Sequence, residues 1–148
     1  MTSPRRLAVA AATPRPLLLD TGGWLRALAG DPAFAAALSR AAPAIVPSPV
    51  LPEVDWHLRK RRGDMHRLLR EITEGRYEYV ASTLADVARA AQLDRKFADV
   101  GLGLVDSTVA AIGERLGVRR ILTIDSDFVA IRVGPRFRDA FELAVPLE

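Results

Sequence analysis

Short apolar runs alternate along the chain with longer segments of helical periodicity. Each run is bounded by turn residues or by an acidic residue, which predicts a short buried strand. The predicted strands cover residues 17–19, 44–46, 77–80, 118–124 and 141–145. Segments of helical spacing between them, several of them bounded by caps or glycines, predict helices over residues 24–29, 31–40, 48–63, 64–75, 84–91 and 106–117. Strands separated by helices in this way predict an α/β fold with a mainly parallel sheet covered on both faces.

Individual residues set the predicted element boundaries. Thr-Gly-Gly after Asp20 predicts a turn before the first helix, and Ser48 is positioned to cap the third. Leu84, Val87, Ala88 and Ala91 have the i, i+3, i+4 spacing of a helix. Gly117 is placed to end the last long helix.

The chain of 148 residues has the length of one domain. Residues 1–15 carry no periodic pattern and end among prolines, so we expect a flexible N-terminal tail followed by one domain over residues 16–148. The arginines and alanines of this tail faintly imitate a signal peptide, but Pro14 interrupts them. No apolar run approaches the roughly 18 residues of a membrane span, and the absence of cysteine gives no sign of an oxidising compartment. We therefore expect a cytoplasmic protein that does not insert into membranes.

The chain is moderately basic, with 21 lysines and arginines against 18 acidic residues. This balance permits a nucleic-acid partner without requiring one. The densest basic cluster is Arg59, Lys60, Arg61 and Arg62. Two interpretations stay open: the cluster contacts RNA phosphates, or it is a solvated helix end.

Four acidic residues are predicted to converge at one edge of the sheet. Asp20 and Asp125 directly follow predicted strands, Asp106 opens a predicted helix, and Glu53 lies in the first turns of another. Ligands of open parallel sheets bind beyond the carboxyl ends of the strands. Carboxylates gathered there would repel one another without a cation, and hard ions such as Mg²⁺ and Mn²⁺ prefer oxygen ligands.

Each acidic residue also has a purely structural interpretation. Asp20 and Asp106 could be helix caps. Glu53 could be a solvated surface charge, and Asp125 and Asp127 could be turn residues. The residue types alone do not decide between these interpretations and a metal site.

The local sequences around the four residues favour the metal site. They read Leu-Leu-Leu-Asp20-Thr-Gly, Pro-Ser-Pro-Val-Leu-Pro-Glu53, Gly-Leu-Val-Asp106-Ser-Thr and Ile-Leu-Thr-Ile-Asp125-Ser-Asp-Phe. In order and spacing this series resembles the four motifs of PIN domains, and it is most similar to the VapC-like ribonuclease toxins of type II toxin–antitoxin modules. The resemblance extends from Leu17 to Pro146 and implies a three-layer sandwich with a mainly parallel central sheet of four to five short strands flanked by helices.

The resemblance implies a role for each residue that matches a motif. Asp20, Glu53, Asp106 and Asp125 would hold catalytic Mg²⁺, for which Mn²⁺ could substitute, and Asp127 would be either a further ligand or a turn residue. Three threonines would support the carboxylates through their hydroxyls: Thr123, Thr21 and Thr108. The chain departs from the family pattern at Ser107, where alanine is frequent, and at Ser126, where arginine or lysine is frequent.

The resemblance also implies an activity and partners. It implies hydrolysis of RNA, in a transfer RNA or a ribosomal RNA loop, by an endoribonuclease that a small protein antitoxin neutralises and that forms a homodimer. The alternative is a catalytically silent PIN-like module that binds RNA or protein. A dehalogenase-like phosphatase would need an aspartate where Gly22 stands, and a dinucleotide-binding domain would need a glycine motif that Thr-Gly-Gly-Trp does not supply.

Histidine chemistry is not required by this interpretation. His57 and His66 are therefore assigned either to the exposed surface or to the buried apolar stripe of a helix. Trp24 and Trp56 could either belong to the core or stack against a partner.

Overall fold

Three leucines form the central strand of the sheet. Leu17, Leu18 and Leu19 of β1 (Arg15–Leu19) are fully buried. β1 pairs in parallel with β2 (Ala41–Pro47) on one side and with β4 (Arg120–Leu122) on the other. The outer strands are β3 (Glu78–Val80), beside β2, and β7 (Glu142–Leu143), beside β4. The sheet order β3-β2-β1-β4-β7 confirms the predicted mainly parallel α/β fold.

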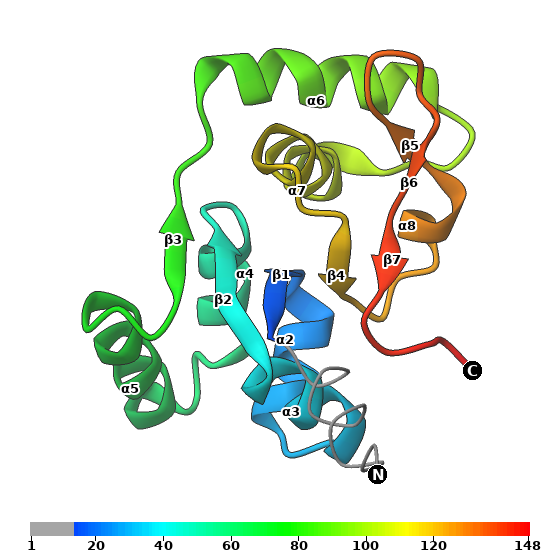
Figure 1. Cartoon of the computed structure of the whole chain (residues 1–148). Coiled ribbons are helices and arrows are strands. Elements are labelled where there is room, and N and C mark those ends of the chain that lie inside the picture. Colours follow the sequence, from blue (N-terminus) through cyan, green and yellow to red (C-terminus); the bar gives the residue numbers. More distant parts are fainter. Residues whose placement is uncertain (1–13) are drawn as a thin grey trace, which may run out of the picture.

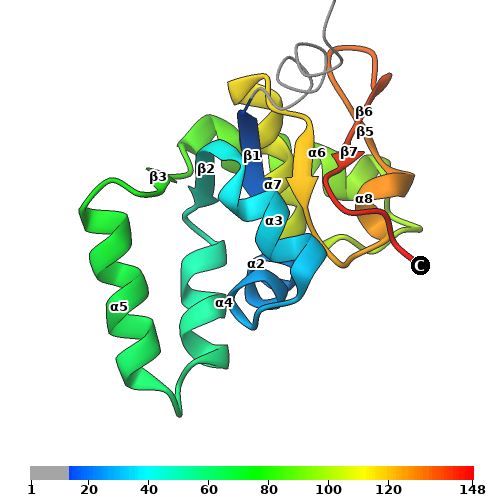
Figure 2. The same ribbon diagram turned by 60° about the horizontal axis from the view of Figure 1, so that its bottom comes forward.

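Helices cover both faces of this sheet in the computed structural model, which describes residues 14–148. The helices are α2 (Thr21–Leu28), α3 (Pro32–Ser39), α4 (Val50–His57), α5 (Arg62–Thr73), α6 (Leu84–Lys96), α7 (Gly103–Leu116) and α8 (Asp127–Ala130). Figure 1 shows α6 and α7 on one side of the sheet and α2 and α3 on the other, which gives the expected three layers. In Figure 2, α4 and α5 run in opposite directions as a helical hairpin beside the sheet.

The C-terminal part differs from the prediction in its strands. The strand expected over residues 141–145 contains only the two residues of β7. A separate antiparallel pair, β5 (Arg132–Val133) and β6 (Asp139–Ala140), precedes it. The strand expected over residues 118–124 is also shorter, because β4 covers only Arg120–Leu122.

The predicted turn after Asp20 is wrong, because α2 begins at Thr21 and includes both glycines. A Cβ atom at Gly23 would collide with the backbone carbonyl of Leu122, and one at Gly22 would meet the side chain of Ile124. The glycines therefore allow α2 to pack directly against the chain at the end of β4. Glycine here reflects a close approach rather than a turn.

The predicted helix over residues 48–63 is also wrong in its bounds. α4 ends at His57, and α5 begins at Arg62 rather than at Asp64. Ser48 caps neither helix, because its hydroxyl accepts a hydrogen bond from the backbone N–H of Ser82 at 2.9 Å. Ser48 instead links the end of β2 to the chain that follows β3.

The helix predicted around Leu84 is present as α6, but its spaced apolar side chains face outward. Leu84 is 87% exposed and Val87 is 47% exposed, whereas Asp86 is buried. Asp86 completes a capping box with Thr83 and accepts hydrogen bonds from the guanidinium of Arg115 on α7. This ion pair joins α6 to α7, and Asp86 is buried on the same helix as Ala90 and Leu93.

The first strand begins one residue before the predicted domain boundary at residue 16. Arg15 already belongs to β1, where it pairs with Ala41. The rest of the predicted tail, residues 1–13, lies outside the described residues. Within residues 14–148, no helix combines the length and the apolar character needed to cross a bilayer.

Candidate active site

The parallel strands bring their carboxyl ends to one edge of the sheet. Leu18 of β1 lies in register with Ile121 of β4 and with Ile45 of β2. The residues that follow these strands therefore leave the sheet at the same edge. The chain after β1 continues into Asp20, and the chain after β4 continues through Thr123 to Asp125.

One cavity of about 610 Å³ contains all four predicted acidic residues. They come from four separate segments of the chain. The four acidic residues in its wall are Asp20, Glu53, Asp106 and Asp125. The volume lies in the range of small-ligand sites, so the cavity can accept a nucleotide-sized group.

Threonine hydroxyls hold two of these carboxylates. The hydroxyl of Thr123 donates to Oδ2 of Asp20 at 2.7 Å, and the hydroxyl of Thr21 donates to Oε1 of Glu53 at 2.6 Å. The Thr123 oxygen also accepts the backbone N–H of Asp125 at 3.0 Å. Thr123 therefore joins the segments after β1 and β4, and both carboxylates have fixed orientations.

Burial and mutual repulsion raise the proton affinity of the cavity carboxylates. Asp20 is only 5% exposed, and burial is the main reason why its pKa lies above the ordinary value. Burial and the charges of Asp20 and Asp125 raise the pKa of Asp106 to about 8. A carboxyl with such a pKa holds a proton near neutral pH unless a cation replaces it.

The closest group of carboxylates contains Asp106, Asp125 and Asp127. One oxygen from each lies within 4.8 Å of the others, which is compatible with a shared metal ion. Burial and the charge of Asp125 raise the pKa of Asp127. The backbone N–H of Asp127 also donates to Oδ1 of Asp125 at 2.9 Å, so Asp125 combines the expected turn role with its place in the cavity wall.

The helix-cap interpretation does not describe Asp20 or Asp106. Asp20 occupies the N-cap position of α2, but its side chain makes no cap hydrogen bond. Asp106 lies in the first turn of α7, which begins at Gly103, so it is not the cap that the sequence suggested. Thr108 is buried in α7, and within residues 14–148 its hydroxyl donates to none of the site carboxylates.

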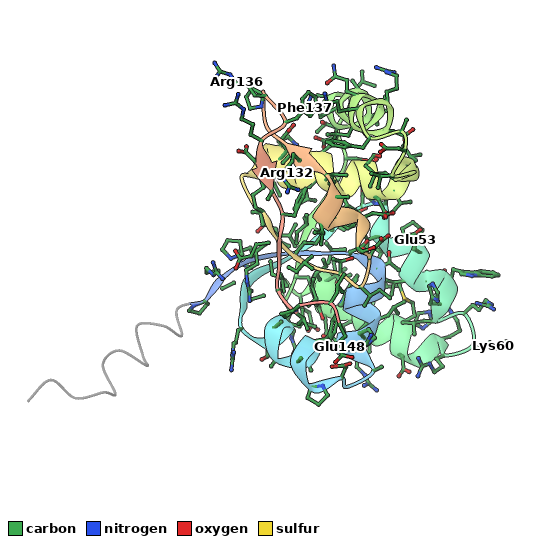
Figure 3. All side chains as sticks on the ribbon, turned by 90° about the vertical axis from the view of Figure 1, so that its right-hand side faces the viewer. Glu53, Lys60, Arg132, Arg136, Phe137 and Glu148 are labelled. Atoms are coloured by element: carbon green, nitrogen blue, oxygen red, sulfur yellow. The ribbon has the colours of Figure 1, made fainter. Side chains whose placement is uncertain are left out.

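The four basic candidates have different surroundings. Arg61 lines the cavity, and its nearest acidic partner is Asp64 at 3.9 Å. Arg62 forms an ion pair with Asp55 at 2.8 Å, and Arg59 lies over the ring of Trp56. Figure 3 shows Lys60 at the outer end of the turn between α4 and α5, away from Glu53.

Two basic residues of the cavity wall were not predicted. His57 lies in the wall, although the sequence assigned it to the surface or to the buried stripe of a helix. Arg26 of α2 lies in the wall as well. The i, i+4 spacing of Glu53 and His57 on one helix is the sequence signal that could have identified His57. Arg26 is already engaged, because its guanidinium donates to Asp31 at 2.6 Å and covers the ring of Phe34.

A parallel α/β chain with carboxylates gathered beyond its central strands matches one known family by sequence. A family model described as the PIN domain matches residues 17–134. Ribonuclease VapC26 of Mycobacterium tuberculosis is 32% identical over 131 residues, which cover 82% of this chain and 97% of that protein. The chain belongs to the PIN domain family, which confirms the resemblance seen in its motifs.

Solved structures agree with this assignment at the level of the fold. The crystal structure of VapC20 from Mycobacterium tuberculosis, a sarcin-ricin loop cleaving toxin, has a TM-score of 0.65 at 20% identity and covers 77% of this chain and 93% of its own. A toxin–antitoxin complex from Klebsiella pneumoniae contains a chain with a TM-score of 0.64 at 17% identity, covering 76% of this chain and 89% of its own.

Proposed function

We propose that this protein is a metal-dependent endoribonuclease that hydrolyses RNA phosphodiester bonds and acts as the toxin of a toxin–antitoxin pair. The observation that carries the proposal is the convergence of four carboxylates from separate segments in one cavity, with the pKa of Asp106 raised to about 8. Carboxyl groups that repel one another in this way are typical of a site built for a cation. The name of the relative VapC26, a ribonuclease, supports the choice of RNA.

The residues of the cavity fit a hard divalent cation such as Mg²⁺ or Mn²⁺. Asp106, Asp125 and Asp127 would hold it, because their oxygens are close enough to share one ion. When bound, such an ion lowers the pKa of a water molecule and stabilises charge on the phosphate oxygens. Asp20 and Glu53 lie in the same cavity wall as Asp106 and Asp125 and would complete the acidic environment.

The side chains of this protein would position the attacking water and accept its proton. The hydroxyl of Thr21 donates a hydrogen bond to Oε1 of Glu53, and within residues 14–148 Oε2 of Glu53 accepts none. This oxygen is therefore free to take a proton from water that enters the cavity. The hydroxyl of Thr123 fixes Asp20 and prevents it from turning away from the cavity.

The partners and the location are part of the same proposal. We propose a small protein antitoxin as the inhibitor, a homodimer as the assembled form, a transfer RNA or ribosomal RNA loop as the substrate, and the cytoplasm as the location. The toxin–antitoxin complex and the sarcin-ricin loop cleaving toxin among the structural neighbours support the first and third of these.

Cleavage of a panel of structured RNAs tests the proposal. The wild type should cut RNA with Mn²⁺ or Mg²⁺ and not with EDTA, and Asp106→Asn should lose the activity because the variant removes a ligand charge. Asp99→Asn, which removes one charge from the exposed turn after α6, should cut at the wild-type rate. RNA binding without cleavage by the wild type would favour the alternative of a catalytically silent PIN-like module. Equal cleavage by the Asp106→Asn variant would contradict the metal site.

A further inference from the structure

The two tryptophans of the chain have opposite environments. Trp24 is fully buried, and its indole N–H donates to the hydroxyl of Tyr77 at 3.4 Å. Trp56 is 60% exposed. Tryptophan is enriched at interfaces because it combines a large apolar ring with a polar N–H, so an exposed indole is a candidate contact for a partner.

Arg59 holds the exposed ring in place. Its guanidinium carbon lies 3.8 Å from the centroid of the Trp56 ring, and its Nη1 donates to the Trp56 carbonyl oxygen at 2.9 Å. Within residues 14–148, Arg59 forms no ion pair. The stacked pair therefore presents an aromatic ring and an available positive charge together.

The stacked pair lies next to the acidic cavity. Trp56 follows Glu53 by three residues on α4, so the two side chains lie on neighbouring parts of the helix surface. His57, the next residue, and Arg61, in the turn that follows α4, belong to the cavity wall. In Figure 3, the labels of Glu53 and Lys60 mark the two ends of the segment that runs from the first turns of α4 into the turn after this helix. Its acidic end lies at the cavity, and its basic end lies at the turn.

We propose that Trp56 and Arg59 form a stacking platform for an unpaired base of the RNA substrate, with His57 and Arg61 contacting the phosphates between that base and the cavity. The proposal rests on the function proposed above and specifies how the substrate is held. Aromatic rings and arginine planes are the surfaces on which proteins stack splayed RNA bases. A polyanion also suits a segment whose exposed side chains after Glu53 include four basic groups: His57, Arg59, Lys60 and Arg61.

Tryptophan fluorescence provides a test that does not depend on cleavage. In EDTA, an unstructured 12-nucleotide RNA should quench the emission of Trp56, whereas the same strand with abasic sugars should bind through its phosphates without quenching. The Trp56→Ala variant should show no quenching and should bind the intact RNA about 5- to 100-fold more weakly, the range expected for loss of one base–aromatic stack. Trp56→Phe should recover part of the affinity. Arg95→Ala, which removes an exposed positive charge from α6, is the matched control with unchanged quenching.

Kinetics separate this proposal from the proposed function. If the wild type cuts RNA, Trp56→Ala should raise KM with little change in kcat, and an unchanged KM would contradict the platform. If the wild type cuts no RNA in the panel, the proposed function fails, and quenching by RNA still decides the platform. Absence of quenching at millimolar strand concentration would overturn it. Loss of acrylamide access to Trp56 in a complex with the co-expressed antitoxin, without any response to RNA, would assign the surface to a protein partner instead.

Discussion

Two hydroxyl groups next to the cavity differ in whether they have a partner. The hydroxyl of Thr123 both donates to Asp20 and accepts from the backbone of Asp125. Ser107, beside Asp106 on α7, is fully buried, and within residues 14–148 its oxygen has no hydrogen-bond partner. A buried polar atom without a partner loses its hydration and gains nothing in return. Position 107, where the family frequently has alanine, therefore costs this chain stability.

We expect Ser107→Ala to raise the free energy of unfolding by about 1 kcal/mol, because alanine removes the unpaired hydroxyl and little volume. Denaturant unfolding measures the change. Thr123→Val is the matched control, since it removes a hydroxyl that has two partners, and we expect it to lower the free energy of unfolding by about 1–3 kcal/mol. A Ser107→Ala variant that is less stable than the wild type would show that the hydroxyl has a partner in solution.

At the scale of the elements, α2 combines a poor helix sequence with a close contact. Gly22 and Gly23 disfavour a helix by propensity, but the backbone at Gly23 packs against the carbonyl of Leu122. The same substitution should therefore have opposite effects in different helices. Gly63 in α5 has no atom within 4 Å of the position that a Cβ would occupy.

We expect Gly23→Ala to lower the melting temperature by several degrees, because the added methyl must displace backbone at the end of β4. Gly63→Ala should instead raise the free energy of unfolding by about 0.5–1 kcal/mol through helix propensity alone. Thermal melts of both variants beside the wild type make the comparison. Stabilisation by both substitutions would show that α2 and β4 are further apart than the structure has them.

The elements that were predicted correctly are those whose signals are local. Apolar runs located all five strands of the parallel sheet, and Gly117 ends α7 with a φ of 70° as expected. The start of α2 and the outward face of α6 were not predictable, because they depend on contacts across the fold. Gly23 meets Leu122, and Asp86 meets Arg115 on another helix. Neither partner is visible in the periodicity of a single segment.

The cavity belongs to the whole molecule, since its wall comes from segments far apart in the chain. Motif order was sufficient to predict which four carboxylates meet there. It was not sufficient to predict that Asp106, Asp125 and Asp127 form the closest group, or that His57 shares the wall. These details depend on the direction of side chains after the strands end, and that direction is decided by packing and by hydrogen bonds such as Thr123 to Asp20.

The pH dependence of stability follows from the same convergence. The pKa of Asp106 is raised from 3.8 to about 8, so between these values the metal-free folded state binds a proton that the unfolded state releases. The contribution of this proton to the free energy of unfolding is fully present below about pH 4 and is lost as the pH rises through about 8. The metal-free wild type should therefore melt several degrees lower at pH 8 than at pH 5.

Substitution of Asp106 isolates this contribution from that of other titrating groups. Asp106→Asn carries no charge at either pH, so in EDTA its melting temperature should fall less between pH 5 and pH 8 and should exceed that of the wild type at pH 8. Millimolar Mn²⁺ should raise the melting temperature of the wild type at pH 8, by an amount equivalent to about 2.7 kcal/mol at a hundredfold excess over Kd, and should raise that of the variant much less. Asp99→Asn, in the exposed turn after α6, should follow the wild type throughout. Identical pH profiles for the wild type and Asp106→Asn would mean that Asp106 holds no extra proton, and an equal response of both to Mn²⁺ would mean that it is not a ligand.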